Sequence, residues 1–203
     1  LKDIMKIARC VCFKCSKLLI NKTQHKHILS RPAEDRWDYV SAMGAKGIKR
    51  CGEKTEDGCG CRQPDKIKLE GMATLVAMWD NIDTSEGGEA QKITMKLTPE
   101  IILKIFKRIS DDDVTFMGFS PIWSRPDWMI YQALPVPPPA VRPSVKHDAQ
   151  QRSEDDLTHI YSNIIKTNNV LREKMANPDT HVNVVEGWFT ILQHSVAMIV
   201  NNK

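Results

Sequence analysis

The chain has 203 residues, 41% hydrophobic and 27% charged, a composition typical of a folded protein with one large or two small domains. No apolar run approaches the ~18 residues of a membrane span and no signal-peptide pattern opens the chain, so a membrane protein or a secreted disulfide framework is not expected. The sequence begins with Leu1 rather than Met, and we expect it to be a piece of a longer polypeptide.

The net charge of +4 is unevenly distributed along the chain. Residues 1–68 contain 16 Lys/Arg and 8 Asp/Glu, whereas the remainder contains 13 and 17. A basic first part favours a polyanionic partner such as nucleic acid, although a solvated lysine-rich surface explains the charge equally well.

All six cysteines lie between residues 10 and 61. Cys12 and Cys15 form a C-x2-C pair, which lets one tight turn direct two thiolates at one ion, and Cys51 and Cys59 form a looser second pair. Four thiolates on zinc leave no open position for water, so the spacing predicts a structural metal rather than a catalytic one. Glycines flank the second pair, as a metal-binding turn requires, at positions Gly52, Gly58 and Gly60.

Other ligand sets stay open at this point. Cys10 could replace Cys12, Cys61 could replace Cys59, and His25 or His27 lies close in sequence. A redox C-x-x-C motif and six unrelated thiols are the remaining alternatives.

The secondary structure that follows is mixed. Residues 31–43 predict a helix, with Pro32 in its first turn and Gly44 at its end. Residues 66–71, 74–79 and 92–97 predict short strands of a small antiparallel sheet, with residues 83–91 as a flexible loop. Residues 97–110 predict a helix capped by Thr98, with Pro99 at its first position. Its apolar face consists of Ile101, Ile102, Ile105, Phe106 and Ile109.

Three adjacent aspartates, Asp111, Asp112 and Asp113, allow two interpretations. A metal-binding catalytic cluster is one. The simpler one is a short helix that Ser110 caps and that ends at Gly118. The aspartates would then lie in its first turn, where the helix dipole favours acidic side chains.

Five prolines then predict an extended, stiff strap between two structural units, with an SH3-type ligand as the alternative. They are Pro135, Pro137, Pro138, Pro139 and Pro143.

Residues 152–203 predict two helices of about 18 residues in an antiparallel hairpin. Ser153 and Asp156 have the spacing of a capping box, and Asn168 is expected in the seam, where it would help to fix register. The apolar series are Leu157, Ile160, Ile164 and Leu171 on the first helix, and Val185, Trp188, Leu192, Val196 and Ile199 on the second. A protruding hairpin of this kind is a docking element at least as often as a packed core pair.

Three segments in this order, "LTPEIILKIFKRIS", "SRPDWMIYQALPVPPPAVRPSV" and "QRSEDDLTHIYSNIIKTNN", resemble the largest subunit of eukaryotic-type, multisubunit DNA-dependent RNA polymerases. The polymerase II branch is the most similar. "CVCFKCSKLLI" matches the same subunit upstream, so the resemblance covers nearly the whole chain.

The resemblance implies an α+β fold with three parts. Residues 1–133 would be a zinc-bearing clamp head, 134–151 a proline-rich strap, and 152–203 the clamp coiled coil. It implies structural zinc on Cys12, Cys15, Cys51 and Cys59, with the other two cysteines as bystanders. The family's catalytic magnesium motif, "NADFDGD", does not occur here, so magnesium and catalysis belong to the parent enzyme outside this chain.

The implied task is mechanical: a zinc-stiffened flap retains DNA and the RNA–DNA hybrid through sequence-independent phosphate contacts. Candidate contacts are Lys14, Lys17, Lys46, Lys49, Arg50, Arg62, Arg125 and Arg142. Initiation and elongation factors would dock at the hairpin tip, at Asn177, Pro178 and Asp179, and other polymerase subunits would be partners. The location would be the nucleus for a cellular enzyme, or a viral factory or virion for a large DNA virus. A free-standing zinc-stabilised nucleic-acid adapter and a purely structural module are the rival functions.

Overall fold

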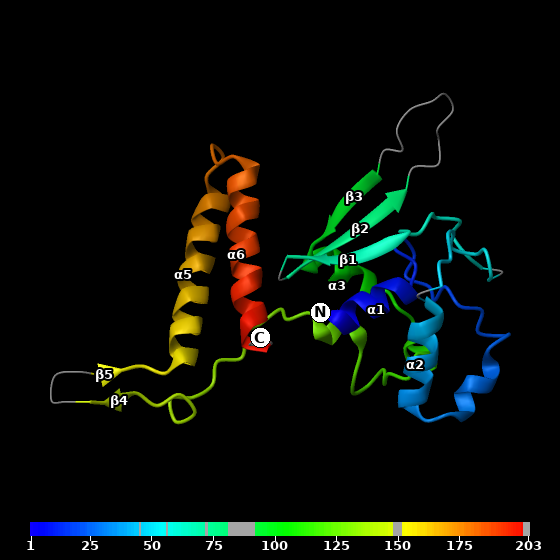
Figure 1. The fold of residues 1–203 in the computed structure, drawn as a ribbon, viewed down its shortest axis with the longest axis horizontal. Helices are drawn as coiled ribbons and strands as arrows, with labels where there is room; N and C mark the ends of the chain where they lie inside the picture. Colours follow the sequence, from blue (N-terminus) through cyan, green and yellow to red (C-terminus); the bar gives the residue numbers. More distant parts are fainter. Residues whose placement is uncertain (45, 56, 72, 81–91, 148–151, 201–203) are drawn as a thin grey trace. The chain divides into compact units, whose positions relative to one another are not determined.

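The computed structural model describes residues 1–203 except 45, 56, 72, 81–91, 148–151 and 201–203 (Figure 1). The chain divides into two compact units. The first comprises Leu1–Glu70 and Thr74–Gln132, and the second comprises Gly71–Ala73 and Ala133–Lys203.

The first unit opens with a helix that the sequence analysis did not predict, α1 (Lys2–Cys10). Its buried side chains, Ile7 and Cys10, lie on the face that packs into the core, and α1 contacts both the second helix and the first strand. Arg9 donates a hydrogen bond of 2.5 Å to the carbonyl oxygen of Ile67 in that strand. The contacts that stabilise α1 are therefore remote in sequence.

The predicted helix at residues 31–43 is confirmed as α2 (Ala33–Gly44), and a short 3-10 helix, η1 (Lys26–Ser30), precedes it. The predicted sheet is also confirmed. Strands β1 (Lys66–Glu70), β2 (Thr74–Asp80) and β3 (Lys92–Leu97) pair antiparallel in the order β1-β2-β3. The loop predicted at 83–91 lies outside the described residues.

Helices α3 (Pro99–Lys107) and α4 (Asp111–Phe116) begin at the predicted caps, and the 3-10 helix η2 (Pro126–Met129) follows. Thr98 Oγ1 accepts from the Ile101 backbone N–H at 3.4 Å, and Ser110 Oγ accepts from that of Asp113 at 3.2 Å. These elements close one core with α1, α2 and the sheet, centred on fully buried residues such as Ile7, Val40, Phe106 and Met117.

In the second unit the proline-rich segment is fixed to the helix that follows it. Short strands β4 (Val145–Lys146) and β5 (Arg152–Ser153) pair before α5 (Asp156–Ala176). Tyr161 Oη donates to the Pro135 carbonyl oxygen at 2.9 Å. Arg142 donates to the Pro137 carbonyl oxygen at 3.0 Å and to Thr158 Oγ1 at 3.3 Å.

Helices α5 and α6 (Val182–Val200) lie side by side as a helical hairpin (Figure 1). The five residues predicted to form the α6 seam are all half-buried, and Val182, Val184, Ile191 and Val200 are exposed. Among the described residues of α6 none is fully buried. No described helix combines the length and apolar character required to cross a bilayer.

One detail of the predicted hairpin is wrong, the cap of its first helix. The cap of α5 is Asp155, whose Oδ1 accepts from the Leu157 backbone N–H at 2.8 Å, and not Ser153. Ser153 belongs to β5, where its hydroxyl pairs with His147 Nε2 at 2.7 Å, so strand pairing moves the helix start two residues on. Thr167 is a buried polar residue of α5, and Asn168 beside it is half-buried like the predicted seam residues of α6, so its role in fixing register stays a prediction.

Candidate metal centre

The candidate metal centre is built from two turns, each closed by a single antiparallel bridge. Val11 pairs with Leu18 around the first turn, and Arg50 pairs with Arg62 around the second. In the first turn the Cys12 backbone N–H donates to the Lys17 carbonyl oxygen at 2.8 Å. In the second, the Cys51 backbone N–H donates to the Cys61 carbonyl oxygen at 2.9 Å.

The two turns bring the four predicted ligands together. The Sγ atoms of Cys12, Cys15, Cys51 and Cys59 all lie within 4.8 Å of one another. The Cys12–Cys59 sulfur distance is 3.6 Å and the Cys15–Cys51 distance is 3.7 Å. Disulfide sulfurs would lie about 2.05 Å apart. Four sulfurs at about 2.3 Å from a tetrahedral zinc would lie about 3.8 Å apart, so the separations match a tetrathiolate site.

The remaining two cysteines have other surroundings. Cys10 is fully buried in the core, where its thiol donates to the Lys6 carbonyl oxygen at 3.2 Å, and burial raises its pKa to about 12. Cys61 is half-buried beside the cluster, and burial raises the pKa of its thiol as well. Neither belongs to the group of four.

The four clustered thiols differ in electrostatic environment. Burial raises the pKa of Cys15 and of Cys51. A hydrogen bond from the backbone of Cys61 lowers the pKa of the exposed Cys59 to about 7. Cys59 is therefore the thiol most easily ionised of these three before a metal binds.

Two glycines in the second turn approach each other too closely for any side chain. A Cβ atom on Gly58 would lie 2.1 Å from Gly52 Cα, and Gly52 itself has φ of +94°. Backbone freedom predicts glycines at these positions, and this contact between the two backbones is a second reason for them.

A residue that the sequence analysis missed connects the two turns. Gln63 is only 3% exposed, and its Oε1 accepts from the Phe13 backbone N–H at 2.9 Å. Its Nε2 donates to the Cys61 carbonyl oxygen at 2.9 Å and lies 3.2 Å from Cys12 Sγ. No sequence signal identified it, since Gln63 is 50 residues from Phe13 and has no motif of its own.

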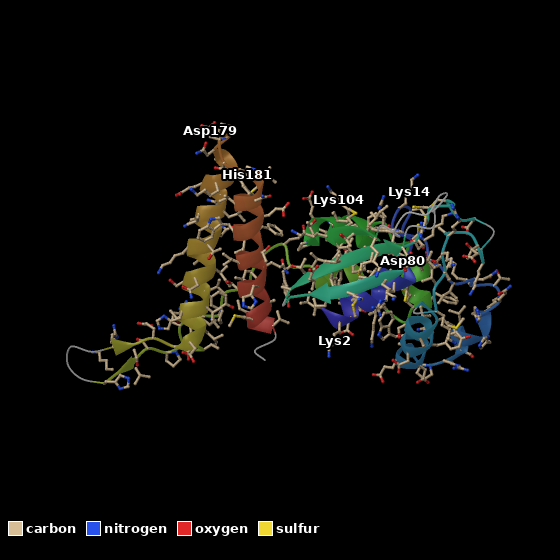
Figure 2. All side chains as sticks on the ribbon, turned by 45° about the horizontal axis from the view of Figure 1, so that its top comes forward. Lys2, Lys14, Asp80, Lys104, Asp179 and His181 are labelled. Carbon is tan, nitrogen blue, oxygen red and sulfur yellow. The ribbon has the colours of Figure 1, made fainter. Side chains whose placement is uncertain are left out.

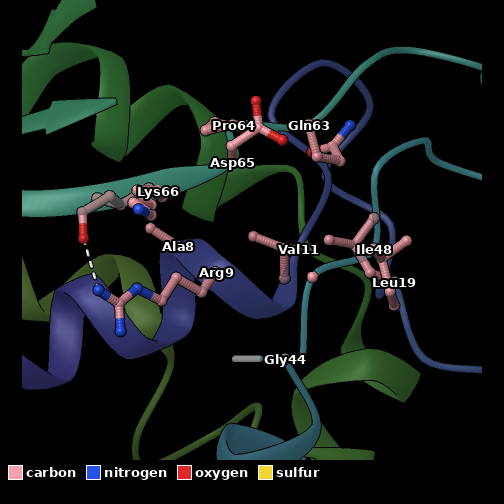
Figure 3. A pocket seen from close by; sticks show the side chains of 12 residues that line it. Ala8, Arg9, Val11, Leu19, Gly44, Ile48, Gln63, Pro64, Asp65 and Lys66 are labelled. Atoms are coloured by element: carbon pink, nitrogen blue, oxygen red, sulfur yellow. Dashed lines mark hydrogen bonds between the residues drawn. The ribbon is translucent and has the colours of Figure 1, made fainter. Parts of the chain in front are cut away.

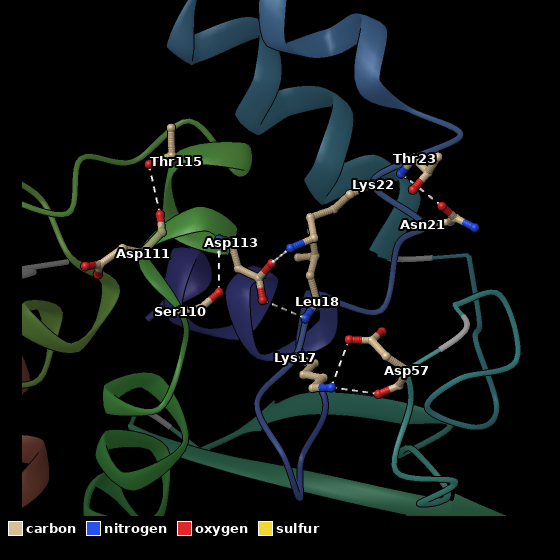
Figure 4. Close-up of polar contacts among 10 residues, drawn as sticks. All are labelled: Lys17, Leu18, Asn21, Lys22, Thr23, Asp57, Ser110, Asp111, Asp113 and Thr115. Carbon is tan, nitrogen blue, oxygen red and sulfur yellow. Dashed lines mark hydrogen bonds and ion pairs between the residues drawn. The ribbon is translucent and has the colours of Figure 1, made fainter.

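The surface around the centre has its own ion pairs (Figure 4). Lys17 Nζ of the first turn pairs with Asp57 Oδ2 of the second at 2.8 Å, which raises the pKa of Lys17 and lowers that of Asp57. Both groups are solvent-exposed, so the pair contributes little to stability.

The three aspartates form the first turn of helix α4, which Ser110 caps, as the simpler of the two interpretations predicts. Asp113 is buried, where Oδ1 pairs with Lys22 Nζ at 2.6 Å and Oδ2 accepts from the Leu18 backbone N–H at 3.3 Å (Figure 4). It thus fixes the segment that follows the first metal turn. Asp111 pairs with Arg125.

Five of the eight predicted nucleic-acid contacts are exposed: Lys14, Lys17, Lys46, Lys49 and Arg50. Arg50 also donates to the Gly60 carbonyl oxygen at 3.4 Å, and Lys17 and the three remaining arginines have intramolecular partners as well. Lys17 pairs with Asp57 and Arg62 with Asp65. Arg125, whose side chain is 18% exposed, pairs with Asp111 and Asp127, and Arg142 holds the proline-rich segment.

The predicted docking residues form the turn between α5 and α6, with Asp179 at its tip (Figure 2). Asn177, Pro178 and Asp179 are all exposed. Asn177 Oδ1 accepts from the Asp179 backbone N–H at 3.0 Å, which stiffens the turn.

A cavity of about 280 Å³ lies beside the metal turns in the first unit (Figure 3). Its lining is mixed, with Val11, Leu19 and Ile48 on the apolar side and Arg9, Asp65 and Lys66 on the polar side. Gln63 forms part of the wall, and its Nε2 lies 3.2 Å from Cys12 Sγ.

Comparison with known proteins places the chain in a family. The sequence matches the family described as RNA polymerase Rpb1, domain 1, over residues 1–203. It is 34% identical over 209 residues to the DNA-directed RNA polymerase II subunit RPB1 of Euplotoides octocarinatus, an alignment that covers 98% of this chain and 42% of that protein. The chain thus spans less than half of that relative. The predicted resemblance to the largest subunit of a polymerase II-like enzyme is confirmed, and the chain belongs to the RNA polymerase Rpb1 domain 1 family.

Proposed function

We propose that this chain is the clamp region of the largest subunit of a multisubunit DNA-directed RNA polymerase. Its task would be to retain DNA and the RNA–DNA hybrid in the cleft and to dock transcription factors through the helical hairpin. The observation that carries the proposal is the family match over the whole chain, on a unit whose four clustered cysteines adjoin exposed basic residues.

The metal in this proposal is zinc, held by Cys12, Cys15, Cys51 and Cys59. A tetrathiolate zinc supplies stability, since structural sites contribute roughly 10–16 kcal/mol of apparent binding free energy. Around it, the Arg50–Arg62 bridge closes the second turn, and Gln63 and the Lys17–Asp57 pair connect that turn to the first. The exposed basic residues of the two turns are thereby held in fixed positions.

Nucleic-acid contact in this proposal falls mainly to Lys14, Lys46, Lys49 and Arg50, because their side chains are exposed. Arg62 and Arg125 are already engaged within the first unit, so we assign them supporting roles at that surface, whereas Arg142 holds the proline-rich segment of the second unit. Lysines contacting phosphates give sequence-independent, salt-sensitive retention.

Catalysis and its magnesium would belong to other parts of the parent enzyme. Initiation and elongation factors would contact the tip of the hairpin, where helices α5 and α6 would act as the clamp coiled coil. Other polymerase subunits and nucleic acid complete the list of partners, and the nucleus is the proposed location.

The test uses the assembled polymerase. Its largest subunit carries two substitutions, Lys14→Ala and Lys49→Ala. Dissociation of nucleic acid from the elongation complex is measured as a function of KCl concentration. Removing two phosphate contacts should lower the slope of log affinity against log salt by roughly 1.8.

The matched control is Lys104→Ala on the same unit (Figure 2). Lys104 is an exposed lysine paired with Glu100 at 2.6 Å on α3, and its removal should leave the slope unchanged. An unchanged slope in the double variant, or an equal fall in the control, would contradict the proposed retention surface.

A further inference from the structure

The side chain of Gln63 makes contacts that few other residue types could make together. It follows the second metal turn, and its backbone N–H donates to the Lys49 carbonyl oxygen at 2.8 Å, which fixes the residue at the base of that turn. Its carboxamide reaches across to the first turn, at Phe13 and Cys12. One buried side chain therefore contacts both halves of the metal centre.

The orientation of this carboxamide follows from its partners. The Phe13 backbone N–H is a donor and requires an acceptor, so the Gln63 oxygen must face Phe13. The NH2 group then faces the Cys61 carbonyl oxygen and the Cys12 sulfur, both of which accept. An amide supplies two N–H donors and an oxygen acceptor, and all three kinds of contact are used.

The contact with sulfur has an electrostatic consequence. Four thiolates around a divalent cation leave surplus negative charge on the sulfurs, and burial makes that charge costly. Cys12, itself fully buried, lies 3.2 Å from Gln63 Nε2 and 3.4 Å from the Lys14 backbone nitrogen. N–H groups that donate to a thiolate offset this cost, in the same way that outer partners support other metal ligands.

We propose that Gln63 is a positioning residue of the metal centre. It holds the two turns at binding distance through Phe13 and Cys61, and it stabilises the Cys12 thiolate through an N–H···S hydrogen bond. The inference rests on the proposed metal site and adds to it a residue outside the four ligands.

Two substitutions separate the parts of this role. Gln63→Glu is close to isosteric and keeps an acceptor for Phe13, but it cannot donate to Cys12 or Cys61 when ionised. Gln63→Leu removes donor and acceptor together. Gln24→Leu is the matched control, because Gln24 is an exposed glutamine of the same unit and its side chain is not among the hydrogen bonds of the centre.

The experiment loads the 203-residue chain and its variants with Zn²⁺ and measures the rate of zinc transfer to a colorimetric chelator. Loss of a supporting partner typically weakens metal binding 10–100-fold, so both Gln63 variants should release zinc at least tenfold faster, and the Glu variant at least as fast as the Leu variant. Gln24→Leu should release zinc at the wild-type rate.

A second readout reports on the sulfur itself. In chains loaded with Co²⁺, loss of the N–H···S bond raises the energy of the sulfur lone pair, so the sulfur-to-cobalt charge-transfer band should move to longer wavelength in both Gln63 variants. A purely structural role for Gln63 would leave that band in place. Wild-type release rates in Gln63→Leu, or an unshifted band in Gln63→Glu, would overturn the inference.

The same measurements distinguish failure of the metal site from failure of this inference. The wild-type chain should bind one Zn²⁺ in native mass spectrometry, Cys12→Ser should lose it, and Cys10→Ser should keep it. Absence of zinc in the wild type, or equal losses in the two cysteine variants, would refute the site itself. A normal site with unaffected Gln63 variants would refute only the role of Gln63.

Discussion

At the scale of single residues, Ser16 in the first metal turn has an unfavourable conformation and an unpaired hydroxyl. Its backbone N–H donates to the Cys12 carbonyl oxygen at 2.9 Å, which closes the turn and gives Ser16 a φ of +63°. The residue is 1% exposed, and its hydroxyl has no hydrogen-bond partner among the described residues. Both the left-handed backbone conformation and the unpaired buried hydroxyl of Ser16 therefore lower the stability of the folded chain.

We predict that Ser16→Gly stabilises the zinc-loaded chain. Relief of the left-handed conformation is worth about 1–2 kcal/mol and removal of an unpaired buried hydroxyl about 1–3 kcal/mol, against about 0.5–1 kcal/mol of added chain entropy in the unfolded state. The free energy of unfolding, from urea titration, should rise by about 1–4 kcal/mol.

Ser16→Ala separates the two effects of that substitution. It removes the hydroxyl but keeps the strained φ, so its gain should be smaller than that of Ser16→Gly. Equal stability of the glycine variant and the wild type would show that the turn stores no strain at this position.

Residue spacing predicted the four clustered cysteines because C-x2-C is a local pattern that one turn can satisfy. Spacing alone left Cys61 open in place of Cys59, two positions away; the family resemblance implied Cys59, and the sulfur distances agree. Gln63 and Ser16 could not be predicted, because the role of each depends on where the chain places a distant or unpaired atom.

At the scale of elements, the second metal turn depends on the contact between Gly52 and Gly58. We predict that Gly58→Ala prevents this turn from closing, since its Cβ would lie 2.1 Å from a backbone atom that has no freedom to move away. Zinc release to a chelator should become faster, and the thermal midpoint of the first unit should fall.

Gly187→Ala is the matched control for that substitution. Gly187 lies in α6, where an added Cβ would have nothing within 4 Å. An alanine in an exposed helix interior should stabilise α6 by about 0.5–1 kcal/mol and leave zinc release unchanged. Slower or unchanged zinc release in Gly58→Ala would contradict the proposed role of the glycine pair.

Elements with local signals were predicted well, and those with remote partners were not. The start of α3 follows from Thr98 and Pro99 alone, and the three strands from their alternation and flanking turns. Helix α1 depends on contacts with α2 and β1, both of which begin more than 20 residues after α1 ends. Ser153 failed as a cap because strand pairing with residues 145–146 competes for it.

At the scale of the whole molecule, the chain has two compact units with different surfaces. The first contains the cysteine cluster and the exposed lysines of its turns. The second ends in a hairpin whose turn is polar and exposed, while α6 carries exposed apolar side chains such as Val184 and Ile191. Retention of nucleic acid and docking of factors are therefore separable by substitution, because each proposal concerns a different unit.

The last prediction concerns the tip of that hairpin. Asp179 is exposed in a turn that Pro178 and the Asn177 side chain stiffen, so a partner would meet its carboxylate in a fixed position. Asp179→Lys reverses the charge without altering a buried contact. We expect it to weaken binding of an initiation or elongation factor to the assembled polymerase by tenfold or more, measured by pull-down titration.

Glu154→Lys makes the same charge change at the opposite end of the hairpin, about 30 Å away along α5 at 1.5 Å per residue. Because an exposed charge at that distance is several Debye lengths from the tip at physiological salt, this control should bind factors like the wild type. Equal weakening by both variants would point to a general charge effect on the second unit. Normal factor binding by Asp179→Lys would exclude the Asp179 carboxylate as a docking contact.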